Sequence, residues 1–202
     1  MAKIFLIGVS CVGSTSIGRD LSLRIGHRFQ DLGPLIEEEL GMTMPVLTRQ
    51  CFTMTEKRMR CRPTLESFIE RHREYDYVMA LTPGCLMDHM WRALKKEEDR
   101  VVIVIKDRPL NIMKRAVFYD DEQNVIKKRL NDRQKESLLE GIKQDMSYFR
   151  RSHARGDMNV DIDGGSVAEA TEQIIKELVE MGVIDHIGND VARCENLHRL
   201  IF

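Results

Sequence analysis

Short apolar runs alternate along this chain with segments whose apolar residues recur every three or four positions. The first run, residues 3–8, is rich in branched residues and ends at a glycine, which predicts a buried strand. A helix face follows, with apolar residues at Ile17, Leu21 and Ile25. Gly26 is positioned to end that helix. Strand, glycine-rich turn and helix in this order predict the start of a parallel α/β sheet.

The same alternation continues to residue 181 and then stops. Apolar runs predict four more strands, at residues 27–31, 75–81, 100–105 and 159–162. Helical spacing predicts helices at 34–41, in two pieces of 45–74 separated near Pro63, and at 85–96, 108–118, 133–154 and 166–181. We therefore expect an α/β protein with three α/β/α layers and a five-stranded parallel sheet. Residues 1–181 form the expected domain, and residues 182–202 a C-terminal tail.

Residues 8–15 follow the first strand and read Gly-Val-Ser-Cys-Val-Gly-Ser-Thr. They match the phosphate-loop pattern G-x-x-x-x-G-K-[ST], except that Ser14 stands at the lysine position. Main-chain N–H groups cradle the phosphate in such a loop, so its shape tolerates this change, but the positive charge is lost. The alternative is a glycine-rich turn without a ligand. The predicted nucleotide contacts are Gly8, Cys11, Val12, Gly13, Ser14, Thr15 and Ser16.

Composition and charge narrow the function classes. The 202 residues carry a formal net charge of −1, which does not favour a general nucleic-acid or membrane surface. No apolar run reaches the roughly 20 residues that span a bilayer. The five cysteines include no C-x-x-C pair, which argues against a zinc site or a disulfide framework. We expect a cytoplasmic protein.

Five short motifs follow one another along the chain in a characteristic order. They are the loop 8–15, Phe29-Gln30-Asp31, Lys57-Arg58, Lys114-Arg115, and Val-Asp-Ile-Asp-Gly at residues 160–164. In this order they resemble shikimate kinase, a small P-loop enzyme of the nucleoside-monophosphate-kinase type, over about residues 3–181. The resemblance implies the fold of those kinases and transfer of the γ-phosphoryl group of ATP, with Mg²⁺, to a hydroxyl of shikimate or a similar small anionic acceptor.

The resemblance also implies roles for individual residues. Thr15 would bind Mg²⁺, and Asp31 would support the metal and contact the substrate, so both are candidate catalytic residues. Arg58 would grip the substrate carboxylate, Gly84 would line the floor of the substrate site, and Arg115 would lie against the adenine. Alternatives remain for three of them: Asp31 as a helix-capping turn residue, Arg58 as a solvated charge, and Arg115 as a surface helix residue.

Two further segments have expected roles, one as a lid and one as a packing tail. Residues 119–132 are charged and lack apolar periodicity, which predicts a mobile lid. Lys127, Lys128 and Arg129 are the candidates to supply its closing charge. The tail, residues 182–202, carries apolar residues that are expected to pack on the domain, on a second copy of the chain or on a partner protein.

The sequence departs from the shikimate kinase pattern at several positions. Ser14 replaces the lysine, Gly33 replaces a second acidic residue, and Thr82-Pro83-Gly84 replaces a triple glycine. The second substrate arginine is expected at a position that holds Phe149. These changes leave two functions open: an impaired ATP-dependent kinase, or a non-catalytic nucleotide-binding relative with a regulatory or scaffolding role. Arg19 is a candidate to replace the missing charge.

Overall fold

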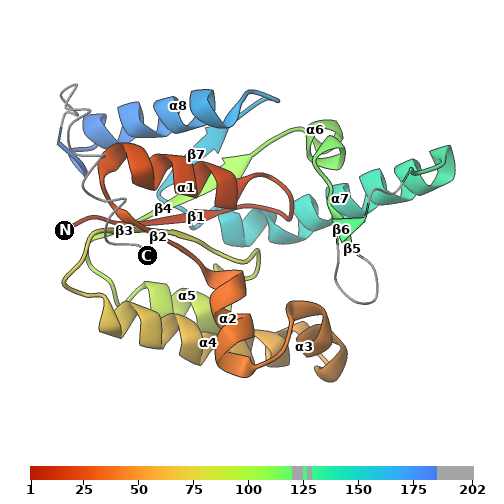
Figure 1. The fold of residues 1–202 in the computed structure, drawn as a ribbon, viewed down its shortest axis with the longest axis horizontal. Helices are drawn as coiled ribbons and strands as arrows, with labels where there is room; N and C mark the ends of the chain where they lie inside the picture. Colours follow the sequence, from red (N-terminus) through yellow and green to blue (C-terminus); the bar gives the residue numbers. More distant parts are fainter. Residues whose placement is uncertain (120–124, 127–128, 186–202) are drawn as a thin grey trace.

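The computed structural model describes residues 1–119, 125–126 and 129–185, in which a parallel sheet is covered by helices on both faces (Figure 1). Its strands are β1 (Lys3–Ile7), β2 (Arg28–Asp31), β3 (Tyr77–Ala80), β4 (Arg100–Lys106) and β7 (Met158–Asp161). The spatial order of these five strands is β2-β3-β1-β4-β7, and every pairing is parallel. The expected α/β fold with a five-stranded parallel sheet is therefore confirmed.

Two helical layers enclose the sheet (Figure 1). One layer contains α1 (Ser14–Ile25) and α8 (Val167–Glu180), and the other contains α2 (Leu32–Leu40), α4 (Met54–Arg71) and α5 (Asp88–Leu94). Successive residues of β1 enter opposite cores, with Phe5 in the cluster that includes α4 and Leu6 in the cluster that includes α8. Because both faces of β1 are buried, its sequence is a continuous apolar run rather than an alternating one.

The carboxyl ends of the strands meet at one edge of the sheet, where the loop 8–15 begins. Gly8 follows the central strand and packs closely against β4. A Cβ atom at Gly8 would lie 2.6 Å from the carbonyl oxygen of Ile105 and 2.5 Å from Cγ1 of Val12. Only glycine fits this space, because both neighbours belong to the tightly packed sheet edge and loop.

The helical region after α2 differs from the expectation. The predicted break near Pro63 is wrong: α3 (Met44–Gln50) ends earlier, and α4 runs through Pro63. The side chain of Thr53 caps α4 by accepting a hydrogen bond from the N–H of Glu56 at 3.1 Å. An internal proline removes one helical hydrogen bond and crowds the preceding turn. The burial of Leu65 and Phe68 against the sheet opposes that cost and keeps α4 continuous.

The segment between α6 (Pro109–Lys114) and α7 (Asp132–His153) contains two short strands that the sequence did not predict. Phe118–Tyr119 forms β5, which pairs antiparallel with β6 (Val125–Ile126). Lys127 and Lys128, expected to supply the closing charge of a lid, lie outside the described residues, whereas Arg129 is exposed. Most of the tail, residues 186–202, also lies outside them. In the described ranges, no helix combines the length and the apolar character needed to cross a membrane.

Two glycines within helices provide a matched test of the packing. A Cβ atom at Gly18 in α1 would lie 2.8 Å from the Phe29 ring, whereas one at Gly141 in α7 would meet nothing within 4 Å. We expect Gly18→Ala to lower the free energy of unfolding by about 1–2 kcal/mol, because overpacking outweighs the gain in helix propensity. Gly141→Ala should raise it by about 0.5–1 kcal/mol. Urea unfolding measures both, and equal signs would contradict the packing described for α1.

Candidate active site

The loop 8–15, called here the glycine loop, leads directly into the first turn of α1. Cys11 and Gly13 have the left-handed φ values of 62° and 109° that bend the chain back on itself. The first hydrogen bond of α1 joins the N–H of Ile17 to the carbonyl of Gly13 at 2.9 Å. The N–H groups of residues 14–16 precede this bond, and Gly13 has no side chain with which to cap them. A helix start with uncapped amides attracts anions.

The predicted contact residues in this loop differ in what they expose. The side chain of Val12 is 1% exposed and packs in the core, so only its main chain faces a ligand. Thr15 and Ser16 are exposed, and Ser14 is half-buried. The loop therefore offers main-chain N–H groups and hydroxyls, and the residue at position 14 adds no positive charge.

Two predicted metal-supporting residues from different elements meet at the start of α1. The hydroxyl of Thr15 donates a hydrogen bond to Oδ2 of Asp31 at 2.6 Å. Oδ1 of Asp31 accepts from the N–H of Gly33 at 3.0 Å and caps α2. Asp31 therefore has the helix-capping role and also contacts the glycine loop.

The pair fits Mg²⁺, which in nucleotide sites takes one or two protein oxygens and completes its shell with phosphates and water. The hydroxyl of Thr15 and the carboxylate of Asp31 are hard oxygen donors of this type, and both face the first turn of α1. Within the described ranges, no group of three or more His, Cys, Asp or Glu residues is arranged to hold a metal ion.

Arg58 lies against the other predicted substrate residue, Gly84. A Cβ atom at Gly84 would approach Nε of Arg58 to 2.8 Å, so the absence of a side chain makes room for the guanidinium. Nη2 of Arg58 donates to the hydroxyl of Tyr148 at 3.2 Å, and Nε is buried without a hydrogen-bond partner among the described residues. Arg58 is thus half-buried, with one buried donor, rather than fully solvated. A buried donor without a partner favours a ligand that accepts from it.

Arg115 is anchored by a carboxylate that the sequence analysis missed. Its guanidinium pairs with the buried Asp107 and donates from Nε to the carbonyl of Cys11 at 3.3 Å. Asp107 also accepts from Asn111 at 2.8 Å and from the N–H of Gly164 at 3.0 Å. Burial alone would raise the pKa of Asp107, but the hydrogen bonds from Asn111 and Arg115 outweigh it and lower the pKa. Arg115 is thus tied to the glycine loop and is not a free surface residue.

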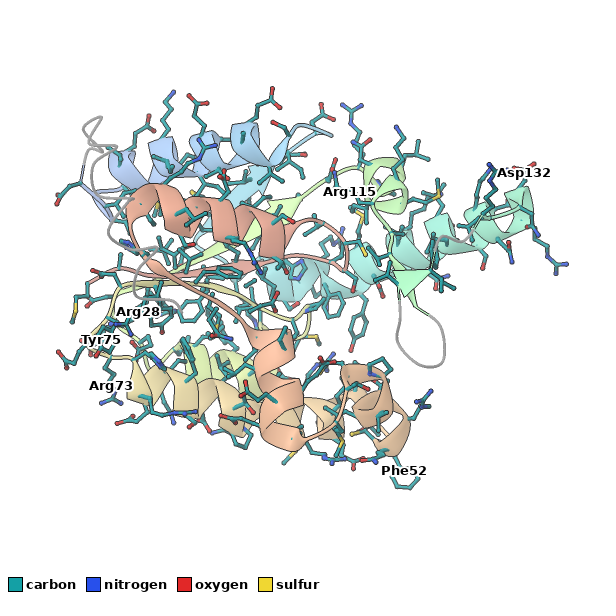
Figure 2. All side chains as sticks on the ribbon, in the orientation of Figure 1. Arg28, Phe52, Arg73, Tyr75, Arg115 and Asp132 are labelled. Carbon is teal, nitrogen blue, oxygen red and sulfur yellow. The ribbon has the colours of Figure 1, made fainter. Side chains whose placement is uncertain are left out.

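The remaining arginines that the sequence analysis considered are Arg19 and those next to Phe149. The guanidinium of Arg19, a candidate to replace the missing lysine charge, lies 5.4 Å from the ring centroid of Phe29. Phe149 is buried, and Arg150 and Arg151 beside it are exposed. Figure 2 shows Arg115 beside α6, far along the molecule from the cluster of Arg28, Arg73 and Tyr75. Among the described residues, Arg58 and Arg115 are the predicted site cations that the fold places at this edge.

The model of one protein family, described as Shikimate kinase, matches residues 10–180 of the chain. The chain belongs to the shikimate kinase family. Among curated members, the shikimate kinase of Persephonella marina is 27% identical over 179 residues, which are 87% of this chain and 98% of that protein. The shikimate kinase of Thermus thermophilus is 26% identical over 177 residues, 87% of this chain and 89% of its own.

Solved structures of shikimate kinases share the fold. The enzyme from Bacteroides thetaiotaomicron superimposes with a TM-score of 0.70 at 18% identity, covering 89% of this chain and 98% of the solved one. The enzyme from Acinetobacter baumannii, solved in complex with shikimate, gives a TM-score of 0.63 at 18% identity, covering 88% and 93% of the two chains. Membership of the shikimate kinase family supports an ATP-dependent small-molecule kinase.

The Asp107 cluster predicts a pH-dependent stability in this family member. Because the folded-state pKa of Asp107 is lowered, its contribution to the free energy of unfolding is present above the unfolded pKa of about 3.9 and is lost as pH falls through the folded value. We expect Asp107→Asn to cost about 2–3 kcal/mol at pH 7 and less below pH about 4.

Urea unfolding between pH 3 and pH 7 measures this difference. Asp132→Asn is the control, because Asp132 is fully exposed at the start of α7 (Figure 2) and should change stability little at any pH. A cost of Asp107→Asn that is the same at both ends of the range would contradict a lowered pKa.

Proposed function

We propose that this protein is an ATP-dependent phosphotransferase that acts on a hydroxyl of a small anionic acceptor, shikimate or a molecule of similar charge. The observation that carries the proposal is the hydrogen bond between Thr15 and Asp31 at the start of α1, in a chain of the shikimate kinase family. Phosphoryl transfer depends mainly on positioning and on neutralising charge. The residues around this bond are suited to positioning the reactants, and only partly to neutralising charge.

The nucleotide half of the proposed site is built from main chain. The N–H groups of residues 14–16 would hold the phosphates, and Arg115, fixed by Asp107, would face the nucleotide base. Thr15 would bind Mg²⁺ and Asp31 would support it. When bound, the metal neutralises charge on the phosphate oxygens.

The acceptor half of the proposed site centres on Arg58. Its buried Nε is free to donate to an anionic acceptor, while Tyr148 and the space left by Gly84 hold the guanidinium in place. A fixed, partly desolvated guanidinium binds a carboxylate or phosphate more strongly than a solvated one does. This supports an acceptor with at least one anionic group.

Ser14 should limit turnover more than binding. A lysine at this position would stabilise the charge that develops during transfer, and a hydroxyl does not. Loss of one preorganised donor typically reduces the rate by roughly 100- to 1000-fold. Nucleotide affinity should fall less, because the main-chain N–H groups remain.

The second candidate is a nucleotide-binding relative that no longer catalyses transfer and serves a regulatory or scaffolding role. Two residues favour it specifically: Ser14 removes a cation, and Gly33 removes a carboxylate next to Asp31. Calorimetric titration of ADP and of a non-hydrolysable ATP analogue with Mg²⁺, together with shikimate-dependent ADP release, separates the two candidates. Binding with measurable turnover supports the kinase, and binding without turnover supports the alternative. Absence of nucleotide binding at millimolar concentration would contradict both.

Restoring the lysine tests the role of position 14 directly. We expect Ser14→Lys to raise kcat by about 100-fold or more, because it adds a positive charge where the transferred group becomes more negative. The control is the double variant Ser14→Lys with Thr15→Ala, which should lose most of that gain because the proposed metal ligand is gone. Steady-state ADP release measures both. An unchanged kcat for Ser14→Lys with normal ADP affinity would show that charge at this position does not limit transfer.

A further inference from the structure

We propose that His153, the last residue of α7, is a positioning residue of the acceptor site: its uncharged, buried ring holds the loop 82–84, against which the guanidinium of Arg58 is placed. The inference rests on the proposed function, because it adds a control by pH to the acceptor half of the same site. His153 itself does not touch the acceptor, and it acts on Arg58 through Pro83 and Gly84.

The first argument is the burial of the His153 ring. His153 is 8% exposed, and its ring stacks on that of Phe149, with the centroids 5.5 Å apart and an angle of 13° between the planes. Nε2 of His153 is buried and has no hydrogen-bond partner among the described residues. An imidazolium carries a proton on both ring nitrogens, and a buried charged donor without an acceptor is costly. The surroundings of the ring therefore favour its neutral form.

The charges around the ring act mainly in the same direction. Burial lowers the pKa of the His153 imidazole below its usual value of 6.5, and the positive charge of Lys106 at the end of β4 lowers the pKa further. The main chain of Pro83 opposes them, because its carbonyl can only accept a hydrogen bond and so favours a protonated ring nitrogen. The ring of His153 thus faces Pro83 and is uncharged at pH 7.

The other titratable groups lie on the segment after β3 and on the end of α7. Burial raises the pKa of the Cys85 thiol to about 12, so that this group is neutral. The exposed carboxylate of Asp88 lies 3.9 Å from the guanidinium of Arg155. Arg150 and Arg151 of α7 are exposed. A proton on the ring would therefore meet cations on α7 and at the end of β4.

The second argument is the position of Pro83 in the acceptor site. Pro83 is followed directly by Gly84, and a Cβ atom at Gly84 would approach Nε of Arg58 to 2.8 Å. The main chain at Gly84 is therefore the wall against which the guanidinium lies. Because Pro83 and Gly84 are joined by a peptide bond, a displacement of Pro83 moves that wall.

The third argument is that α7 and the residue after its end hold the same region at two more points. Tyr148 accepts the hydrogen bond from Arg58 at 3.2 Å, and Arg155 donates to the carbonyl of Leu86 at 2.8 Å. His153 lies between these two residues in the sequence. Among these side-chain types, histidine is the one that changes charge between pH 5 and pH 8. Acid pH should therefore loosen this attachment at His153.

The Nε–H group of Arg58 reports this positioning without any bound acceptor, because it is buried and has no partner among the described residues. Its resonance is assigned as the one missing from Arg58→Lys. It is followed by ¹H–¹⁵N magnetic resonance between pH 5.5 and pH 8, in the full-length wild type and in His153→Gln. The ring resonances of His153 give the midpoint of its own titration in the same wild-type sample.

His72 provides a matched control. Like His153 it lies at the end of a helix, and its ring stacks on an aromatic ring four residues earlier, that of Phe68, with the centroids 4.1 Å apart. His72 is at the end of the helix that carries Arg58, but roughly four turns away from it. His72→Gln therefore removes a stacked histidine from α4 without touching the loop 82–84.

We expect the Arg58 signal of the wild type to shift with the same midpoint as the His153 ring, below pH 6.5, and to return when the pH is raised. The signal should stay constant in His153→Gln, which cannot gain a charge, and should behave as in the wild type in His72→Gln. A ring that serves only the stability of α7 would lower the unfolding temperature in His153→Gln without linking the Arg58 signal to its own proton.

Binding of an acceptor gives a second readout. Shikimate is titrated calorimetrically at pH 7.5 into the full chain saturated with ADP and Mg²⁺. His153→Phe keeps an aromatic ring for the stack on Phe149 but has no nitrogen to face Pro83, so its shikimate affinity should fall at least fivefold. His153→Gln, which keeps a donor, should lose less. The affinity for ADP should stay within twofold in both variants, which shows that they are folded.

An Arg58 signal that titrates identically in the wild type and in His153→Gln would overturn the inference. A shikimate affinity of His153→Phe within twofold of the wild-type value would also overturn it. Failure of the wild type to bind ADP or shikimate is a different result, because it contradicts the proposed function. The titration of Arg58 requires neither ligand and still decides the role of His153.

Discussion

A single carboxylate, that of Asp31, links the two halves of the proposed site. One oxygen accepts from Thr15 at the start of α1, and the other accepts from the N–H of Gly33 at the start of α2. Because β3 lies between the strands that precede these helices, no direct strand pairing joins them. The carboxylate adds a hydrogen-bonded link to the direct packing of α1 against β2. Since α2 packs on α4, which carries Arg58, the bond relates the glycine loop to the acceptor side of the molecule.

The remaining site residues are held by hydrogen bonds that leave selected atoms free. Asp107 fixes Arg115 next to the glycine loop, and Tyr148 with the space at Gly84 fixes Arg58. Among the site residues that the structure describes, the groups left free are the amides of the first turn of α1 and Nε of Arg58. Preorganised groups of this kind lower the cost of ordering a ligand. Among the described residues, the predicted cation that contacts the glycine loop is Arg115, and its guanidinium is already paired with Asp107.

The sequence predicted the sheet well because parallel strands buried on both faces are short apolar runs that few other elements imitate. Through the resemblance to a family, it assigned Thr15 and Asp31 to one metal site and Arg58 and Gly84 to one substrate site, and the members of each pair lie close together. It failed at Pro63, where burial of one helix face outweighed a local signal. It missed Asp107, because a single acidic residue after a strand has no periodic signature until the fold supplies its neighbours.

The close packing of Gly8 and the left-handed turn at Gly13 have a consequence for how such a protein can evolve. The close packing at Gly8 and the positive φ at Gly13 set the path of the loop. The path of the loop and the charge of its side chains are thus set at different positions of one short segment. Under the proposed function, a substitution at position 14 would change the charge offered to a phosphate while the architecture around it is inherited unchanged.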